Sequence, residues 1–178
     1  MAIAKTRSAG FSLIELIIGV VIVGILAALA MPSLQQMLIN NNVRNAAESI
    51  VSGIQRARAE AVARNTDVRF TLASSTSWTV DYVVKPVPSA PAIDSSSGNE
   101  ISSKVTVVAV AKDLSTPATV VTFDNLGQVK DPDTDIRQVD FSAAGATQNL
   151  RITMGAGGNA PKMCDPSLAA GSSPRACS

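Results

Sequence analysis

The carboxylate of Glu15 stands in a segment where ionised groups are rare. Residues 11–31 are apolar or glycine except for Ser12 and Glu15. As a helix, a stretch of this length would span roughly 30 Å, the thickness of the hydrocarbon core of a bilayer. A charged side chain costs free energy there and usually pairs with a cation. Because the segment contains no basic residue, Glu15 is predicted to need a cation that the intact segment does not provide.

A cut in the chain would supply such a cation. Cleavage between Gly10 and Phe11 would give Phe11 a free ammonium group. The positive end of the helix dipole at the new terminus would favour the carboxylate as well. We predict that Glu15 of one subunit pairs with the Phe11 ammonium of its neighbour in a bundle of helices.

Two ordinary interpretations of the apolar segment compete with this one. It could be a cleavable signal with a cleavage site at residues 28–30, although its apolar core is longer than the usual ~7–15 residues and contains an acid. It could also be a plain membrane anchor, which has no need of Glu15. Lys5 and Arg7 precede the segment and no basic residue follows until Arg44, which predicts a cytoplasmic N-terminal end.

The rest of the chain offers little catalytic or metal-binding chemistry. It contains no histidine, which excludes imidazole bases, nucleophile–histidine pairs and zinc sites that need an imidazole. Its two cysteines, Cys164 and Cys177, cannot form a four-thiolate site. Asp131, Asp133 and Asp135 alternate as in a calcium loop but lack the glycine and distant glutamate of an EF-hand, so an exposed acidic turn is predicted. We therefore predict no enzyme, no cofactor and no metal site.

One long helix accounts for the residues on either side of Glu15 and well beyond it. Pro32 predicts a kink, but the helical period then resumes, and opposite charges four residues apart at 44/48, 56/60 and 60/64 support it. The simplest account is a single helix from Phe11 to about Asn65, whose second half packs an apolar stripe on strands. The stripe consists of Ala46, Ala47, Ile50, Val51, Ile54, Ala57, Ala61 and Val62.

After the helix the apolar period changes to the alternation typical of strands. Six short strands are predicted, the first two as a hairpin, at residues 68–72, 78–83, 105–110, 119–123, 139–142 and 150–154. A helix followed by strands favours the α+β class, with an antiparallel sheet against the helix. Residues 85–104, which contain three prolines, are predicted to be a mobile loop, and residues 156–178 a loop-like tail.

The start of the chain resembles a known signature. The sequence Gly10-Phe11-Ser12-Leu13-Ile14-Glu15 is similar to the leader junction of type IV pilins and type II secretion pseudopilins. The resemblance implies that a prepilin peptidase cleaves after Gly10 and N-methylates Phe11, and that Glu15 guides the subunit into a filament. The helix end and the strand and turn at residues 121–128, within residues 46–154, resemble the GspH/FimT branch of this superfamily.

This resemblance implies a type IV pilin-like fold and a function in assembly. The expected parts are a leader (1–10), a transmembrane and assembly helix (11–31), an amphipathic helix (32–65), an antiparallel β domain (66–155) and a stapled tail (156–178). The implied function is that of a minor pilin of a type IV pilus, with a GspH-like pseudopilin of type II secretion as the alternative. Its partners would be other subunits and the prepilin peptidase, and its location the bacterial inner membrane, with a periplasmic domain, before it joins the filament.

The tail carries two further expectations. In an oxidising periplasm Cys164 and Cys177 are predicted to form one disulfide, with two free thiols as the alternative. The tail resembles those of minor pilins of the FimT/FimU kind, some of which bind DNA through a basic glycine–arginine motif. Here the residues that could contact DNA are Arg151, Lys162 and Arg175, and the stretch matching the motif contains only one cation. Because phosphate binding is mainly electrostatic and the formal net charge is +1, DNA binding is a secondary alternative.

Overall fold

The computed structural model describes residues 12–75, 77–97, 102–155 and 160–177. The chain divides into two units, Met1–Met37 and Leu38–Ser178, which we describe separately. The cleavage junction predicted between Gly10 and Phe11 lies outside the described residues.

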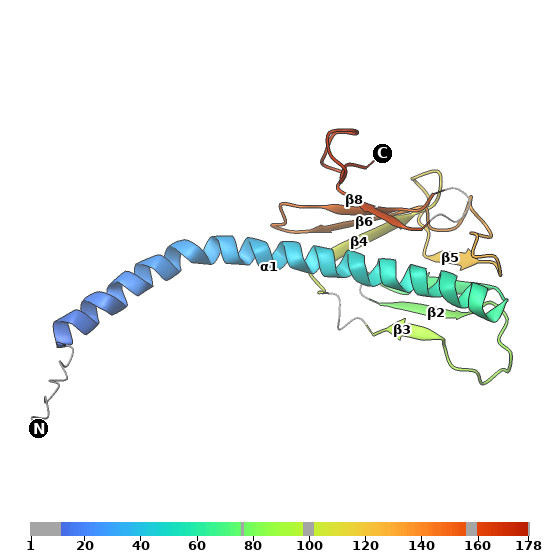
Figure 1. The fold of residues 1–178 in the computed structure, drawn as a ribbon, viewed down its shortest axis with the longest axis horizontal. Helices are drawn as coiled ribbons and strands as arrows, with labels where there is room; N and C mark the ends of the chain where they lie inside the picture. Colours follow the sequence, from blue (N-terminus) through green and yellow to red (C-terminus); the bar gives the residue numbers. More distant parts are fainter. Residues whose placement is uncertain (1–11, 76, 98–101, 156–159, 178) are drawn as a thin grey trace, which may run out of the picture. The chain divides into compact units, whose positions relative to one another are not determined.

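The helix α1 comprises Leu13–Arg64 and continues through Pro32 (Figure 1). The single long helix predicted from the sequence is therefore confirmed. Its first described turn is capped, because the Ser12 hydroxyl accepts the N–H of Glu15 at 3.2 Å. At its other end Asn65 adopts a φ of 50°, a left-handed conformation that asparagine tolerates better than most residues.

In the described part of the chain, eight strands follow the helix and form two antiparallel sheets. One sheet has the order β3-β2-β1-β5 and the other the order β4-β6-β7-β8. In chain order the strands are β1 (Val68–Leu72), β2 (Trp78–Tyr82), β3 (Asp94–Ser96), β4 (Val105–Val110), β5 (Val120–Phe123), β6 (Gln138–Ala143), β7 (Leu150–Thr153) and β8 (Lys162–Cys164).

The α+β class is confirmed, but the sheet differs from the prediction in two respects. The strands of the described segments form two sheets where one was expected. It also adds β3 and β8, which lie in segments predicted to be loops and are three residues long. The strand β3 pairs with β2, and β8 pairs with β7. Because pairing rather than propensity stabilises such short strands, their own sequences carry little signal.

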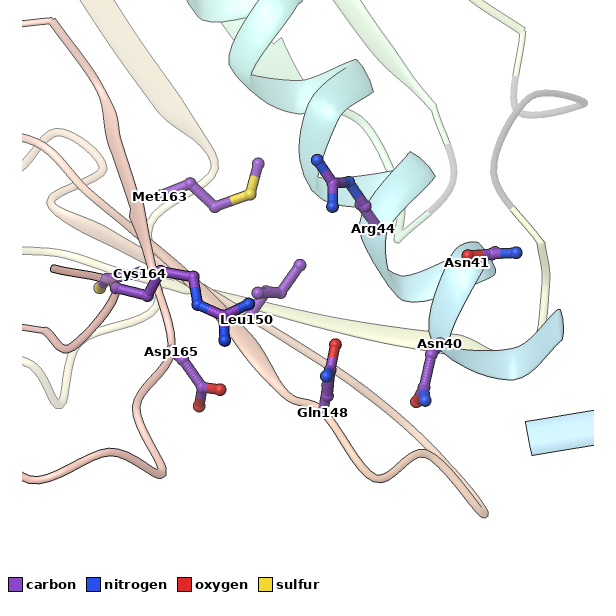
Figure 2. Close-up of a pocket in the computed structure, with 9 residues that line it drawn as sticks. Asn40, Asn41, Arg44, Gln148, Leu150, Met163, Cys164 and Asp165 are labelled. Carbon is purple, nitrogen blue, oxygen red and sulfur yellow. The ribbon is translucent and has the colours of Figure 1, made fainter. Parts of the chain in front are cut away.

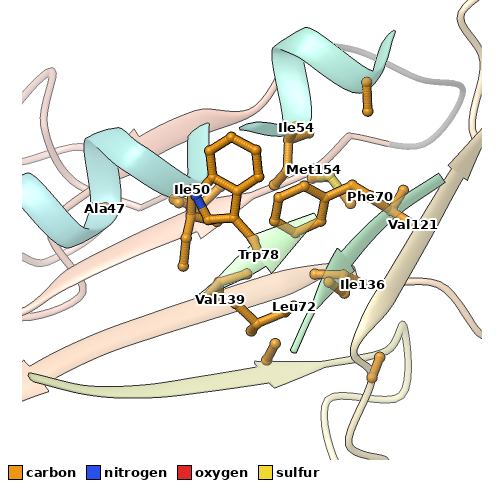
Figure 3. Packing of buried hydrophobic residues seen from close by; sticks show 14 of the residues in the cluster. Ala47, Ile50, Ile54, Phe70, Leu72, Trp78, Val121, Ile136, Val139 and Met154 are labelled. Atoms are coloured by element: carbon orange, nitrogen blue, oxygen red, sulfur yellow. The ribbon is translucent and has the colours of Figure 1, made fainter. Parts of the chain in front are cut away.

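The core of the second unit lies between α1 and both sheets. Ile50 and Ile54 are fully buried beside Phe70 and Trp78 (Figure 3). The buried helix residues are Val43, Ala46, Ala47, Ile50, Gly53, Ile54, Ala57 and Ala61. The predicted stripe is thus confirmed except at its margin, where Val51 is half-buried and Val62 is 51% exposed.

Gly53 allows the helix to approach the aromatic residues closely. A Cβ atom at this position would lie 2.7 Å from Cε2 of Phe70 and 2.9 Å from Cδ2 of Trp78, closer than van der Waals contact permits. The indole N–H of Trp78 donates to the Ser49 hydroxyl at 3.0 Å. One turn of α1 therefore fixes the position of the indole both by packing and by a hydrogen bond.

Candidate functional site

Glu15 lies on an apolar helix surface without tertiary contacts. Every described residue from Ser12 to Leu38 is exposed, and within the described residues the Glu15 carboxylate makes no ion pair. A shallow groove beside it is lined by Leu16, Gly19, Val20 and Val23. The carboxylate is thus surrounded by apolar surface that another helix could cover, and it would then require a cation.

The N-terminal part of α1, which carries Glu15, is apolar enough to cross a membrane. By length and composition, α1 is the one helix among the described residues of which this holds.

The tail is closed by the disulfide between Cys164 and Cys177, whose Cα atoms are 5.0 Å apart. The expected bridge is therefore present. The backbone N–H of Asp165 donates to the carbonyl of Arg175 at 2.7 Å, which fixes the returning chain beside β8. Arg175 and Arg44 line a pocket of about 220 Å³ together with other polar and apolar groups (Figure 2): Asn40, Asn41, Gln148, Leu150, Met163, Cys164 and Asp165.

The three basic residues considered for DNA contact do not form one positive surface. Arg151 donates two hydrogen bonds to the carboxylate of Asp140, at 2.6 and 3.2 Å, so its charge is neutralised locally. Lys162 is exposed on β8, opposite Thr153 in the register. Arg175 lines the pocket that also contains Asp165. The sequence spacing gave no sign of the pairing between Arg151 and Asp140, which arises from the β6–β7 register.

Two carboxylates of the acidic turn, those of Asp133 and Asp135, lie in different environments. Asp133 accepts a hydrogen bond from the Lys112 ammonium at 2.7 Å, which lowers its pKa. Asp135 points inward, is buried, and accepts the N–H of Thr122 at 2.8 Å. Burial raises the pKa of Asp135. The predicted exposed turn is therefore wrong for Asp135, and the described part of the chain contains no group of three or more acidic or cysteine residues able to hold a metal.

The middle of the chain matches a known family. The family model described as type II transport protein GspH matches residues 46–164. This range covers more than half of the chain.

The chain is a member of the GspH family.

The start of this GspH family member carries a second family feature. The prokaryotic N-terminal methylation motif matches residues 5–31, which include Gly10, Phe11 and Glu15. The two matches place the protein in the superfamily of type IV pilins and type II pseudopilins, whose members are structural subunits. No curated protein matches the chain.

The fold of this GspH family member is also that of a solved pilin. A crystal structure of the type IV minor pilin FimU of Pseudomonas aeruginosa is 18% identical, with a TM-score of 0.56 over 78% of this chain and 96% of that chain. A second crystal form of FimU gives 17% identity and a TM-score of 0.50 over 76% and 99% of the two chains. At these levels of sequence identity, the similarity to FimU shows a shared fold only.

The turn between β4 and β5 of this GspH family member is a structured feature that was not predicted from the sequence. Asp113 accepts hydrogen bonds from the backbone and hydroxyl groups of Ser115 and Thr116. These four bonds lower the pKa of Asp113. The signal was available in the sequence, because an aspartate followed by serine and threonine two and three residues later is typical of a side-chain-capped turn.

Proposed function

We propose that this protein is a minor subunit of a type IV pilus. It would be made with residues 1–10 as a leader, inserted in the bacterial inner membrane, cleaved by the prepilin peptidase after Gly10 and N-methylated at Phe11. The observation that carries the proposal is the carboxylate of Glu15, which makes no ion pair with any described residue and stands on an exposed apolar helix that also carries the methylation motif.

In this proposal Glu15 acts as an assembly device. When the apolar helices pack into a filament, water and lipid leave the carboxylate, and an unpaired charge would be costly in that setting. The N-terminal ammonium of Phe11 on a neighbouring subunit would neutralise it. Lys5 and Arg7 would hold the uncleaved N-terminal end in the cytoplasm, which would put Cys164 and Cys177 in an oxidising periplasm, in agreement with the disulfide.

A pseudopilin of a type II secretion system is the second candidate. It is favoured by the description of the family model, which names a type II transport protein, whereas the solved structures with the same fold come from a type IV pilus. Recovery of the protein in surface pili would support the first candidate. Loss of secretion of exported enzymes in a deletion strain, with pili intact, would support the second.

The role of Glu15 is tested by removing its charge without disturbing the start of the helix. Glutamate and glutamine are both favourable at the third position of a helix that begins with a serine cap, so Glu15→Gln removes the charge and leaves the helix start intact. We expect Glu15→Gln and Glu15→Ala to abolish recovery in sheared filaments, while both proteins remain in the membrane. Ser12→Ala removes the cap, keeps the carboxylate and should still be recovered.

Two results would contradict this account of Glu15. Normal recovery of Glu15→Gln in filaments would show that the residue acts only at the helix start. N-terminal analysis of the mature protein provides the second check, because a chain that begins at Met31 instead of methylated Phe11 would be an ordinary exported protein.

A further inference from the structure

The pocket beside the stapled tail has walls from three parts of the second unit. The helix α1 contributes Arg44, the chain that enters β7 contributes Gln148 and Leu150, and the tail contributes Arg175 (Figure 2). The pocket volume is about 220 Å³, which is below the ~300–1,000 Å³ typical of sites for drug-sized ligands. The pocket therefore has room for one small group, such as a single side chain.

The walls of this pocket are held in place by contacts within the domain. The side-chain amide of Asn40 donates to the Thr147 hydroxyl at 2.9 Å and accepts the Thr147 N–H at 3.0 Å, which ties α1 to the chain between β6 and β7. The tail is fixed by its disulfide and by the N–H of Asp165, which donates to the carbonyl of Arg175 at 2.7 Å. A ligand would thus meet a preformed site and would need little reordering of the protein.

The charged groups of the pocket are positive on balance. Arg175 makes no ion pair with any described residue. Arg44 donates its Nε–H to Glu48 at 2.7 Å, which leaves the other four N–H groups of its guanidinium for further acceptors. Asp165 is the one carboxylate among the lining residues, and its Oδ1 already accepts the N–H and the hydroxyl of Ser167 at 2.9 and 2.5 Å. Two cations against one occupied carboxylate favour an anionic ligand.

The remaining lining groups indicate what kind of anion fits. The amides of Asn41 and Gln148 make no hydrogen bond to another described residue, so both can donate to a ligand oxygen. Leu150 and Met163 are half-buried and form an apolar wall. A carboxylate on a short aliphatic chain matches both kinds of surface, because its oxygens suit the guanidinium and amide donors and its carbon atoms suit the wall. A phosphate group has no apolar part to contact that wall.

We propose that this pocket binds the carboxylate of an acidic side chain from a neighbouring filament subunit, with Arg175 and Arg44 as the receiving cations. The inference rests on the proposed function, which supplies the neighbour. The pocket residues Asn40 and Asn41 directly follow, on the same helix, the exposed apolar stretch that ends at Leu38. In a filament other subunits cover that stretch, so a neighbour lies within reach of the pocket. A neighbour without a correctly placed acid would leave Arg175 unpaired, and the pocket would therefore select among neighbours.

The ligand class is tested on the isolated full-length protein in detergent. Butyrate reproduces the carbon chain and carboxylate of a glutamate side chain, and butyramide has the same shape without the charge. The methyl group of Met163 in the pocket wall is a local NMR probe after ¹³C-methyl labelling of the five methionines, and Met163→Leu identifies its signal. At neutral pH, butyrate should shift this signal to saturation, and butyramide should bind at least about tenfold more weakly.

The role of the tail cation is tested with a matched pair of variants. Arg175→Gln should weaken butyrate binding by about tenfold or more, while the backbone carbonyl that accepts the Asp165 N–H remains and the unfolding temperature stays unchanged. Lys162→Gln is the control, because Lys162 is exposed, precedes Met163 and does not line the pocket. It removes the same charge and should leave butyrate binding unchanged. An equal loss with both variants would show unspecific attraction and would overturn the site.

The source of the carboxylate is tested in cells. Recovery of Arg175→Gln in sheared filaments should fall about fivefold relative to the membrane fraction, while Lys162→Gln and the wild-type protein are recovered equally. Normal recovery of Arg175→Gln, together with its loss of butyrate binding, would mean that the pocket takes a free carboxylic acid. That result would overturn the neighbouring subunit as the source.

The remaining outcomes separate the pocket from the proposed function. If butyrate causes no saturable shift of the Met163 signal, or if inorganic phosphate binds more tightly than butyrate, the carboxylate ligand is wrong. If the wild-type protein is absent from filaments, the proposed function fails and the neighbour fails with it as the source. The butyrate titration of the isolated protein decides the chemistry of the pocket in either case.

Discussion

Two stretches of α1 have the same secondary structure and opposite surroundings. In residues 13–37 the large apolar side chains are exposed, with Ile18 at 53% and Val20 at 65%. In residues 43–61 the apolar face is buried, and Ile50 and Ile54 have no exposed surface. One continuous helix thus contains a segment without tertiary contacts and a segment that forms the centre of a core.

The comparison shows that the two stretches depend on different partners. Most helical stability in proteins comes from the packing of an apolar face, and the sheets of the second unit provide this packing for residues 43–61. The exposed apolar surface of residues 13–37 must instead be covered by lipid or by other helices. We expect substitutions in the two stretches to act on different measurements, stability in one and assembly in the other.

The largest expected effect is the difference in the free energy of unfolding between isoleucine-to-alanine substitutions in the two stretches. Ile54→Ala leaves a cavity beside Phe70 and Trp78 and should lower the free energy of unfolding by about 2–5 kcal/mol. Ile18→Ala removes the same atoms from an exposed position and should change it by less than about 0.5 kcal/mol. Both can be measured by denaturant unfolding of the full chain in detergent, with Trp78 as the probe. A loss with Ile18→Ala as large as that with Ile54→Ala would show that the two stretches share one source of stability.

The glycines of α1 offer a second pair with an intermediate effect. The methyl group of Gly53→Ala would overlap the rings of Phe70 and Trp78. Such overpacking costs about 1–3 kcal/mol and outweighs the gain of ~1 kcal/mol that alanine brings to a helix. The unfolding temperature should therefore fall.

Gly24→Ala serves as its control, because, apart from the adjacent backbone of its own helix, no described residue lies within 4 Å of a Cβ at Gly24. The unfolding temperature of this variant should not fall. An unchanged or raised unfolding temperature for Gly53→Ala would mean that the helix and the aromatic residues separate easily, contrary to a tightly packed core.

The smallest expected effect concerns the two carboxylates that diverge in the acidic turn. Burial raises the pKa of Asp135 above the ordinary value of 3.8, so its contribution to stability is complete below that pH and is lost as pH rises through the raised pKa. Asp135→Asn should therefore gain stability relative to the wild type between acidic and neutral pH. Unfolding curves of both proteins, recorded at an acidic and at a neutral pH, measure this difference.

Asp133→Asn should show the opposite trend. The pKa of Asp133 is lowered by its hydrogen bond from Lys112, so its contribution is present above 3.8 and is lost as pH falls through the lowered pKa. Relative to the wild type, this variant should lose stability between acidic and neutral pH. The same trend for both variants would contradict the division of the turn into a buried and an exposed side.

How far the sequence predicted the structure depended on the range of the interactions involved. The helix and the strands with strong alternation follow from local periodicity, and the three ion pairs along α1, at 44/48, 56/60 and 60/64, follow from helical spacing. Other features depend on neighbours that are distant in sequence. These are the strands β3 and β8, the burial of Asp135 and the pairing of Arg151 with Asp140. Local patterns carry no information about such neighbours.

By itself, the sequence determined that an acid stands in a membrane-length apolar helix and that an amphipathic helix and strands follow. These properties depend on residue type and on periods of a few residues. Only the tertiary structure decided that the strands form two sheets, that Gly53 brings the helix onto two aromatic rings, and that Arg44 and Arg175, far apart in the sequence, line one pocket. These features arise from packing and hydrogen bonds, whose geometry exists only once the chain has folded.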